Sequence, residues 1–343
     1  MPGTEPQASF LGIISIRRNQ VDINHDPELE DLELFQRHVV DRFGDLLSPM
    51  EDVAASSETL LSISWLRKLV DVFLCCEAEF KAVLIMGCDP SQLCKPPAVK
   101  ALDICNAVSS GVESVRQYQK FAEIAVSALE QKPMDDGQMI RRKVLRVQIE
   151  HGLSGGEGNT NSANKEQVPG YFRSLSMIVA KNWSASKQIQ AMCSNLVPPR
   201  GGEPTGLALP VYVMSSVMVL VMWALVATLP CQERSELATH FQIPRQLTCA
   251  HSMTGLQEKI GEEWKKKEKK GSMGLLEEID NMEKLALSLI DIANGFQFPG
   301  ETEKIEEVAA QVAELAEICM RMEEGLIPLQ SCRHRLEKCF IQL

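Results

Sequence analysis

The chain has few of the residue patterns on which metal and catalytic sites are built. Its 11 cysteines include no Cys-x-x-Cys pair, which argues against a structural zinc site. No lysine is followed by serine or threonine, so there is no phosphate-binding P-loop, and no His-Glu-x-x-His motif is present. We therefore predict a protein that is not an enzyme, with no metal, no cofactor and no small-molecule substrate.

A secretory signal is also missing. The short apolar run at 10–16 is followed by Arg17 and Arg18, whereas a secretory signal places its basic residues before the apolar run. The cysteines lie in apolar stretches, as in Phe73-Leu74-Cys75-Cys76, where reduced cysteine acts as a small buried hydrophobe. This pattern predicts a cytoplasmic protein.

Basic residues are too few to balance the acidic ones. There are 46 acidic and 35 basic residues, giving a net charge of −11. Nucleic acid and anionic lipid repel such a chain unless its basic residues cluster. One cluster exists, at 265–270, and we interpret it as the solvated end of a helix. We therefore expect no nucleic-acid partner.

What the chain does have is apolar residues at helical spacing. Leu29, Leu32, Phe35 and Val39 recur three and four residues apart, as on one face of a helix, and nothing alternates as a strand would. Heptad-like spacing at 276–282 and 305–319 is typical of antiparallel coiled-coil packing. The predicted fold is all-α, an elongated multi-helix bundle with long amphipathic helices around a central apolar helix. The predicted helices span about 26–46, 57–86, 98–131, 136–150, 176–196, 207–229, 254–269, 275–293, 302–324 and 328–341.

Composition also divides the chain. Residues 1–25 are predicted to form a flexible N-terminal arm, and 26–150 an N-terminal helical region. Gly, Asn and Ser dominate 151–168, which cannot bury enough apolar surface to offset the entropy of ordering and is predicted to be a disordered linker. A C-terminal helical region, 169–343, follows and includes the apolar segment.

The apolar segment 207–229 is the feature that most needs an explanation. No charge occurs from 204 to 232, and 23 residues of helix span roughly 35 Å, slightly more than the hydrocarbon core of a bilayer. A single membrane span and the innermost helix of a bundle both fit. Length favours the span, whereas the amphipathic neighbours need an apolar centre and favour the buried helix. The candidate residues are Leu207, Val211, Val217, Leu220, Trp223 and Leu229.

Cys249 and His251 are the one close cysteine–histidine pair that could suggest a nucleophile. No third group is identifiable that would orient the histidine, so the pair is interpreted as part of an ordinary loop.

Several segments resemble the BYPASS/ROH-like proteins of plants. The central signature is 172–176 (FRSLS), 181–191 (KNWSASKQIQA) and 194–196 (SNL). The apolar segment 206–212 (GLALPVY), with Met222-Trp223 and Pro230-Cys231-Gln232, is also similar. Matches at 9–12 (SFLG), 16–21 (IRRNQV), 101–107 (ALDICNA) and 275–280 (LLEEID) extend the resemblance over nearly the whole chain, in the same order.

The resemblance implies a plant-specific helical protein without assigned catalysis. The ROH-type branch is linked to the seventy-kilodalton exocyst subunit and to restraint of secretion. The BYPASS-type branch is linked to root and shoot development through a mobile growth-arresting signal, and a membrane anchor at 207–229 would fit that alternative. The N-terminus and apolar segment look closer to the ROH type, which implies a helical exocyst subunit as partner. The candidate interaction motif comprises Phe172, Arg173, Ser174, Trp183 and Lys187.

Overall fold

A computed structural model describes residues 27–47, 59–87, 98–130, 184–196, 198, 208–230, 243, 247–268, 275–295 and 302–342. These residues form eight α-helices and no strand, which confirms the predicted all-α class. The predicted flexible N-terminal segment (1–25), the predicted linker (151–168) and the predicted helix at 136–150 lie outside the described residues. The helices are α2 (Pro27–Asp45), α3 (Ile63–Gly87), α4 (Ala98–Glu130), α7 (Ala185–Ser194), α8 (Ala208–Thr228), α9 (Ala250–Glu268), α10 (Glu277–Gly295) and α11 (Thr302–Gln342).

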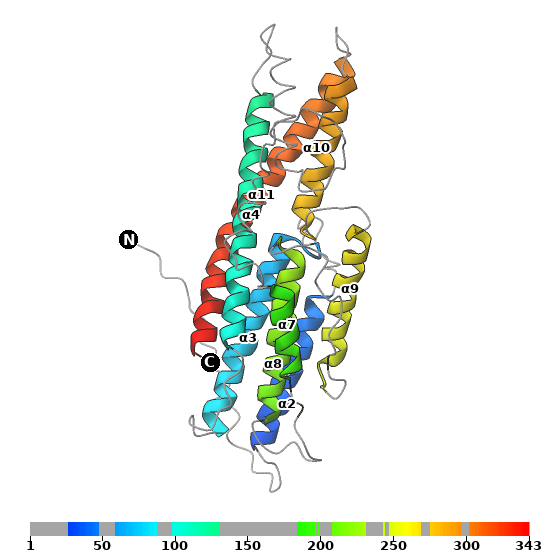
Figure 1. Cartoon of the computed structure of the whole chain (residues 1–343). Helices are drawn as coiled ribbons and strands as arrows, with labels where there is room; N and C mark the ends of the chain where they lie inside the picture. The colour runs from blue at the N-terminus through cyan, green and yellow to red at the C-terminus, as the bar shows by residue number, and fades with distance from the viewer. Residues whose placement is uncertain are drawn as a thin grey trace, which may run out of the picture.

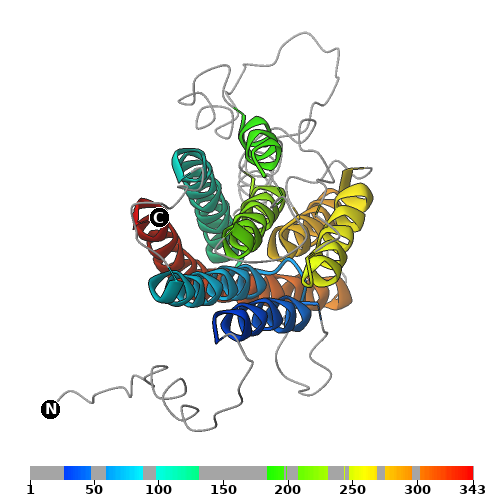
Figure 2. The same cartoon turned by 90° about the horizontal axis from the view of Figure 1, so that it is seen from below.

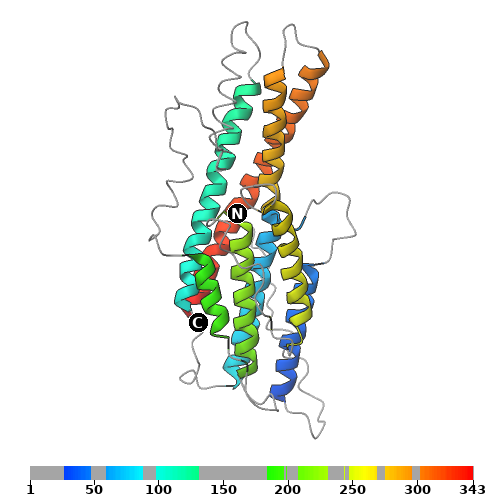
Figure 3. The same ribbon diagram turned by 45° about the vertical axis from the view of Figure 1, so that its right-hand side comes forward.

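The bundle is elongated, and two long helices set its length (Figure 1). α4 has 33 residues and α11 has 41, which correspond to roughly 50 Å and 60 Å of helix. They pack against each other in opposite directions, and α10 packs against the first half of α11 (Figures 1 and 3). We call α10, the first half of α11 and the second half of α4 the arm. The remaining helices and half-helices form the body.

α8 occupies the centre of the body. It contacts α2, α3, α4, α7 and α9, and the end-on view shows it surrounded by other helices (Figure 2). From Tyr212 to Thr228 every side chain except that of Ser215 is buried. The prediction of amphipathic helices around a central apolar helix is therefore confirmed.

The predicted start of α3 is wrong. Residues 57–62 were expected to be helical, but α3 begins at Ile63. Leu61 has φ of +72°, in the left-handed region, which an α-helix cannot contain. The Ser62 hydroxyl then accepts a hydrogen bond from the Trp65 backbone N–H at 3.1 Å, so it caps the first turn.

The predicted break in the last helix is also wrong. Helices at 302–324 and 328–341 were expected, but α11 runs through Gly325 and Pro328 without interruption. Leu326 lies within the expected break, Leu329 follows it, and both are buried in the core. Tertiary packing on this face therefore outweighs the local cost of a glycine and a proline inside a helix.

Candidate functional site

α8 holds most of the residues singled out in the apolar segment. Val217, Leu220, Trp223 and Leu229 are buried in the core. Val211, nearer the start of the helix, is half-buried. Leu207 lies outside the described residues. The structure thus packs the described side chains of this set against other helices of the same chain.

Two buried hydroxyl side chains of α8 form hydrogen bonds within the helix. The Ser216 hydroxyl donates to the Tyr212 carbonyl at 2.8 Å, and the Thr228 hydroxyl donates to the Ala224 carbonyl at 2.7 Å. These hydroxyls can therefore be buried without leaving an unsatisfied donor.

By length and composition, α8 could also cross a membrane. With 21 residues it is long and apolar enough to span a bilayer, and no other helix among the described residues is. However, 83% of its most apolar stretch is buried inside the bundle. The helix that could span a bilayer is the helix that fills the core of the body.

A junction joins the end of α8 to the starts of α3 and α10. The Leu275 N–H donates to the Thr228 carbonyl at 3.3 Å, and the Glu277 N–H donates to the Leu61 carbonyl at 3.2 Å. The Ile63 N–H donates to Glu278 Oε1 at 2.9 Å. The start of α3 and the start of α10, more than 200 residues apart in sequence, therefore meet through hydrogen bonds from backbone N–H groups, where body and arm connect.

Glu278 places a carboxylate at the amino end of α3. A negative group there satisfies a free N–H and complements the helix dipole. Burial nevertheless raises the pKa of Glu278, although the hydrogen bond from Ile63 acts in the opposite direction. Its Oε2 atom is buried and has no hydrogen-bond partner among the described residues. The carboxylate is therefore held at some electrostatic cost.

Gly325 of α11 completes the junction. A Cβ added to Gly325 would lie 2.7 Å from Cγ2 of Ile63 and 3.3 Å from its Cβ. Only glycine allows α11 to pass this close to the first residue of α3. This contact explains a glycine inside a 41-residue helix.

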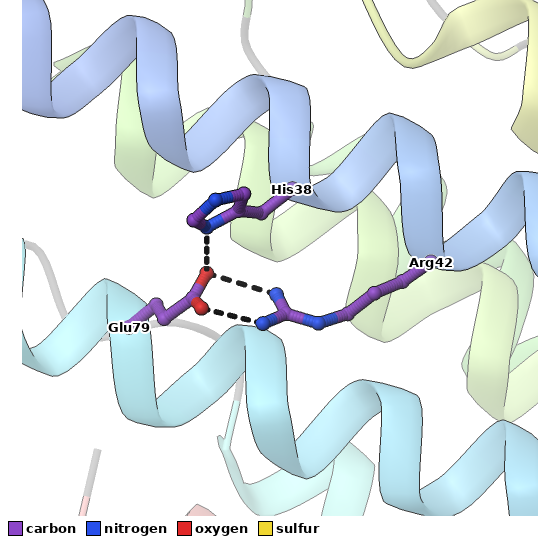
Figure 4. A network of polar contacts seen from close by, with 3 residues as sticks. All are labelled: His38, Arg42 and Glu79. Atoms are coloured by element: carbon purple, nitrogen blue, oxygen red, sulfur yellow. Dashed lines mark hydrogen bonds and ion pairs between the residues drawn. The ribbon is translucent and has the colours of Figure 1, made fainter. Parts of the chain in front are cut away.

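A second polar cluster ties α2 to α3 within the body. His38 and Arg42 lie one turn apart on α2, and both reach Glu79 on α3 (Figure 4). The two terminal nitrogens of Arg42 each donate to a different oxygen of Glu79, one at 2.8 Å, and His38 Nδ1 lies 3.2 Å from Glu79 Oε2. This two-pronged geometry is the strong form of an ion pair.

The electrostatics of this cluster favour the charged pair. Burial opposes ionisation of Glu79, but the hydrogen bonds and charge of Arg42 outweigh it, so the pKa of Glu79 is lowered. The hydrogen bonds that Arg42 donates to Glu79 raise the pKa of Arg42. One turn before Glu79, burial raises the pKa of the Cys76 thiol to about 12. We call His38, Arg42 and Glu79 the clamp, because they connect α2 to α3. The neighbouring Cys76 thiol is not activated, because its pKa is raised.

The motif residues are mostly outside the described part of the chain. Phe172, Arg173, Ser174 and Trp183 are not among the described residues, so their role as an interaction motif stays a prediction. Lys187 is exposed on α7. That helix is capped by Ser184, whose side chain accepts from the Lys187 N–H at 3.4 Å, and it packs on α4 and α8.

The cysteine–histidine pair has no nucleophilic setting. Cys249 is buried, and burial raises its pKa to about 11, while His251 is exposed. A thiol with that pKa stays protonated at neutral pH. Within the described residues, no group of three His, Cys, Asp or Glu side chains could hold a metal ion.

Sequence reasoning missed the polar clusters. His38 and Arg42, four residues apart, could have indicated an acidic partner on a neighbouring helix, but nothing identified Glu79 as that partner. The contact between Glu278 and Ile63 joins residues 215 apart and leaves no local signal.

Comparison with known proteins relates the chain to one family over nearly its whole length. A family model described as Protein ROH1-like matches residues 1–342. Protein ROH1A of Arabidopsis thaliana is 50% identical over 381 aligned positions, covering 96% of this chain and 92% of that protein. Protein ROH1D of the same plant is 38% identical, covering 96% of this chain and 93% of that protein. No solved structure matches.

Proposed function

Because the chain belongs to the ROH1-like family, we propose that it is a non-enzymatic helical adaptor that binds the seventy-kilodalton exocyst subunit and restrains exocytosis. The observation that carries this proposal is the family match over residues 1–342. The link to the exocyst comes from the ROH-type resemblance of the sequence motifs.

The architecture is compatible with such a role. The described residues place most of their large apolar groups in a helical core. The long helices α4 and α11 provide extended surfaces, and a helical partner recognises such surfaces through side chains three, four and seven residues apart. A stable adaptor complex needs about 1,200–2,000 Å² of buried surface in total.

A membrane-anchored developmental regulator of the BYPASS type is the second candidate. One observation favours it, the length and apolar composition of α8. In that case the helix would leave the core and insert into a bilayer. The burial of α8 against five other helices opposes this alternative.

Direct binding tests the first candidate. The purified full-length chain is titrated with the purified seventy-kilodalton exocyst subunit in a calorimeter, with a different exocyst subunit as control. We expect saturable binding to the first subunit, with a Kd of about 10 μM or tighter. Secretion of a reporter should fall when the chain is overproduced in plant cells. Absence of binding would refute the adaptor proposal.

Carbonate washing of plant membranes tests the second candidate. A membrane-anchored chain resists extraction, whereas a chain with α8 in its core is released.

A further inference from the structure

The outward side of α11 exposes apolar residues in a line. Five large apolar side chains are exposed among the described residues: Leu34, Ile124, Leu287, Met320 and Ile327. Met320 and Ile327 are 56% and 62% exposed and lie seven residues apart on α11, so they share one side of the helix. Ala309 and Ala313 are exposed on the same line. The stripe from Ala309 to Ile327 is roughly 27 Å long.

Acidic residues border this stripe on both sides. At about 100° per residue, Glu306, Glu317 and Glu324 lie on one side of Met320 and Glu323 on the other. All four glutamates are exposed. We call the stripe and these four glutamates the α11 face. Between 306 and 324 the sequence has a single basic residue, Arg321, which lies about 100° from Met320.

α10 and the first part of α11 carry a net negative charge nearly as large as that of the whole chain. α10 has five acidic residues and one basic residue, and residues 302–324 of α11 have seven acidic and two basic. These two segments therefore hold a net charge of −9, out of −11 for the whole chain. Such a concentrated field steers a basic partner toward the arm and repels an acidic one.

From this geometry we propose that the α11 face docks a basic amphipathic helix of a protein partner. The proposal rests on the adaptor function and assigns that function a surface. The partner helix lays its apolar side along Met320 and Ile327, and its lysines or arginines reach the bordering glutamates. Methionine suits this role because its flexible thioether adapts to different apolar side chains.

The negative charge of the α11 face also argues against a second copy of the chain or an anionic membrane as its partner. A second copy of the chain that used the same face would place glutamates against glutamates. An anionic membrane would be repelled in the same way. A basic helix satisfies both the apolar stripe and its acidic border.

Two synthetic peptides test the proposal on the full-length chain. Each is a 21-residue amphipathic helix with leucines on one side; one carries lysines beside the leucines and the other carries glutamates. We expect the lysine peptide to bind and the glutamate peptide not to bind, by fluorescence anisotropy at physiological salt. Two double variants, Met320→Ser with Ile327→Ser and Glu317→Lys with Glu324→Lys, should each weaken binding at least about tenfold.

A matched double variant on α2, Glu33→Lys with Leu34→Ser, provides the control. Both residues are exposed in the body, and we expect binding within about twofold of the wild type. Circular dichroism checks that every variant keeps its helix content. Equal binding of both peptides, or unchanged binding by the α11 variants, would overturn the proposal. A dimer of the chain that dissociates in the Met320→Ser, Ile327→Ser variant would also overturn it, since the face would then serve a second copy.

The same variants separate this proposal from the adaptor function. If the wild type binds the exocyst subunit and the α11 variants bind it equally well, the face is wrong and the adaptor function stands. If the wild type fails to bind the subunit but binds the lysine peptide through the α11 face, the exocyst assignment is wrong and the face stands.

Discussion

The body and the arm differ in how far their large apolar side chains are buried. In the body, a charge-free helix lies among five neighbours, and Leu220 and Val217 have no exposed surface. In the arm, α10 and the first half of α11 are strongly acidic, and Leu287 and Met320 are more than half exposed. The body therefore holds the fold together, whereas the arm presents a surface.

The two regions also differ in what a substitution should do. A change at the centre of the body removes contacts that the chain makes with itself. A change on the arm surface leaves those contacts intact and alters only what the chain can bind.

The largest effect is expected at the centre of the body. Leu220→Arg would bury an unpaired charge among apolar side chains and should destabilise the fold by at least about 3–5 kcal/mol, enough to unfold many proteins. Thermal unfolding and circular dichroism measure this loss. Leu34→Arg, at an exposed site on α2, should change stability by only about 0.5 kcal/mol. A folded, soluble Leu220→Arg protein would break the distinction between body and surface.

The second-largest loss of stability is expected at the junction between body and arm. In Gly325→Ala the new methyl group would lie too close to Ile63, and we expect a loss of about 1–3 kcal/mol. In Gly44→Ala on α2 nothing lies within 4 Å of the new methyl group, so the better helix propensity of alanine should add about 0.5–1 kcal/mol. Urea unfolding of both variants measures the sign of each change in the free energy of unfolding. Equal effects at both glycines would mean that α11 does not approach α3 closely.

The clamp between α2 and α3 should contribute less. Glu79→Gln weakens the two-pronged pairing with Arg42 and should cost about 1 kcal/mol at neutral pH. Because the folded-state pKa of Glu79 is lowered, its contribution is present above the ordinary value of 4.5 and is lost as the pH falls through the folded-state pKa. Wild type and variant should therefore converge in acid. A difference that is independent of pH would rule out the ion pair as its source.

The smallest effect, with the opposite sign, is expected at Glu278. Because the folded-state pKa of this group is raised, its favourable contribution is present at low pH and is lost as the pH rises through the folded-state pKa. Glu278→Gln keeps an oxygen to accept from the Ile63 N–H and removes the buried charge. We expect a gain of up to about 1 kcal/mol at pH 7 and little change at pH 4. A loss at pH 7 would show that the carboxylate is needed as a charge.

Sequence patterns located most of the helices because the signals are local. The absence of charge from 204 to 232 placed α8 to within a residue at each end, and the apolar spacing indicated its amphipathic neighbours. The patterns failed where contacts between residues distant in sequence determine where a helix begins or ends. The turn at Leu61 is held by Glu277 and Glu278 of α10, and Gly325 continues α11 because it fits against Ile63. The α11 face was missed because spacing alone does not tell which side of an amphipathic helix stays exposed.

Hydrogen exchange of the α8 backbone tests the central claim, that this helix is the core of the bundle. The purified full-length chain is transferred to deuterated buffer without detergent or lipid, and uptake is followed by mass spectrometry. We predict that amides from Val213 to Ala227 exchange among the slowest in the chain, at the rate of global unfolding, and that lipid vesicles leave them unchanged. Rapid exchange of these amides in buffer, with protection only after vesicles are added, would contradict the account and make α8 a membrane helix.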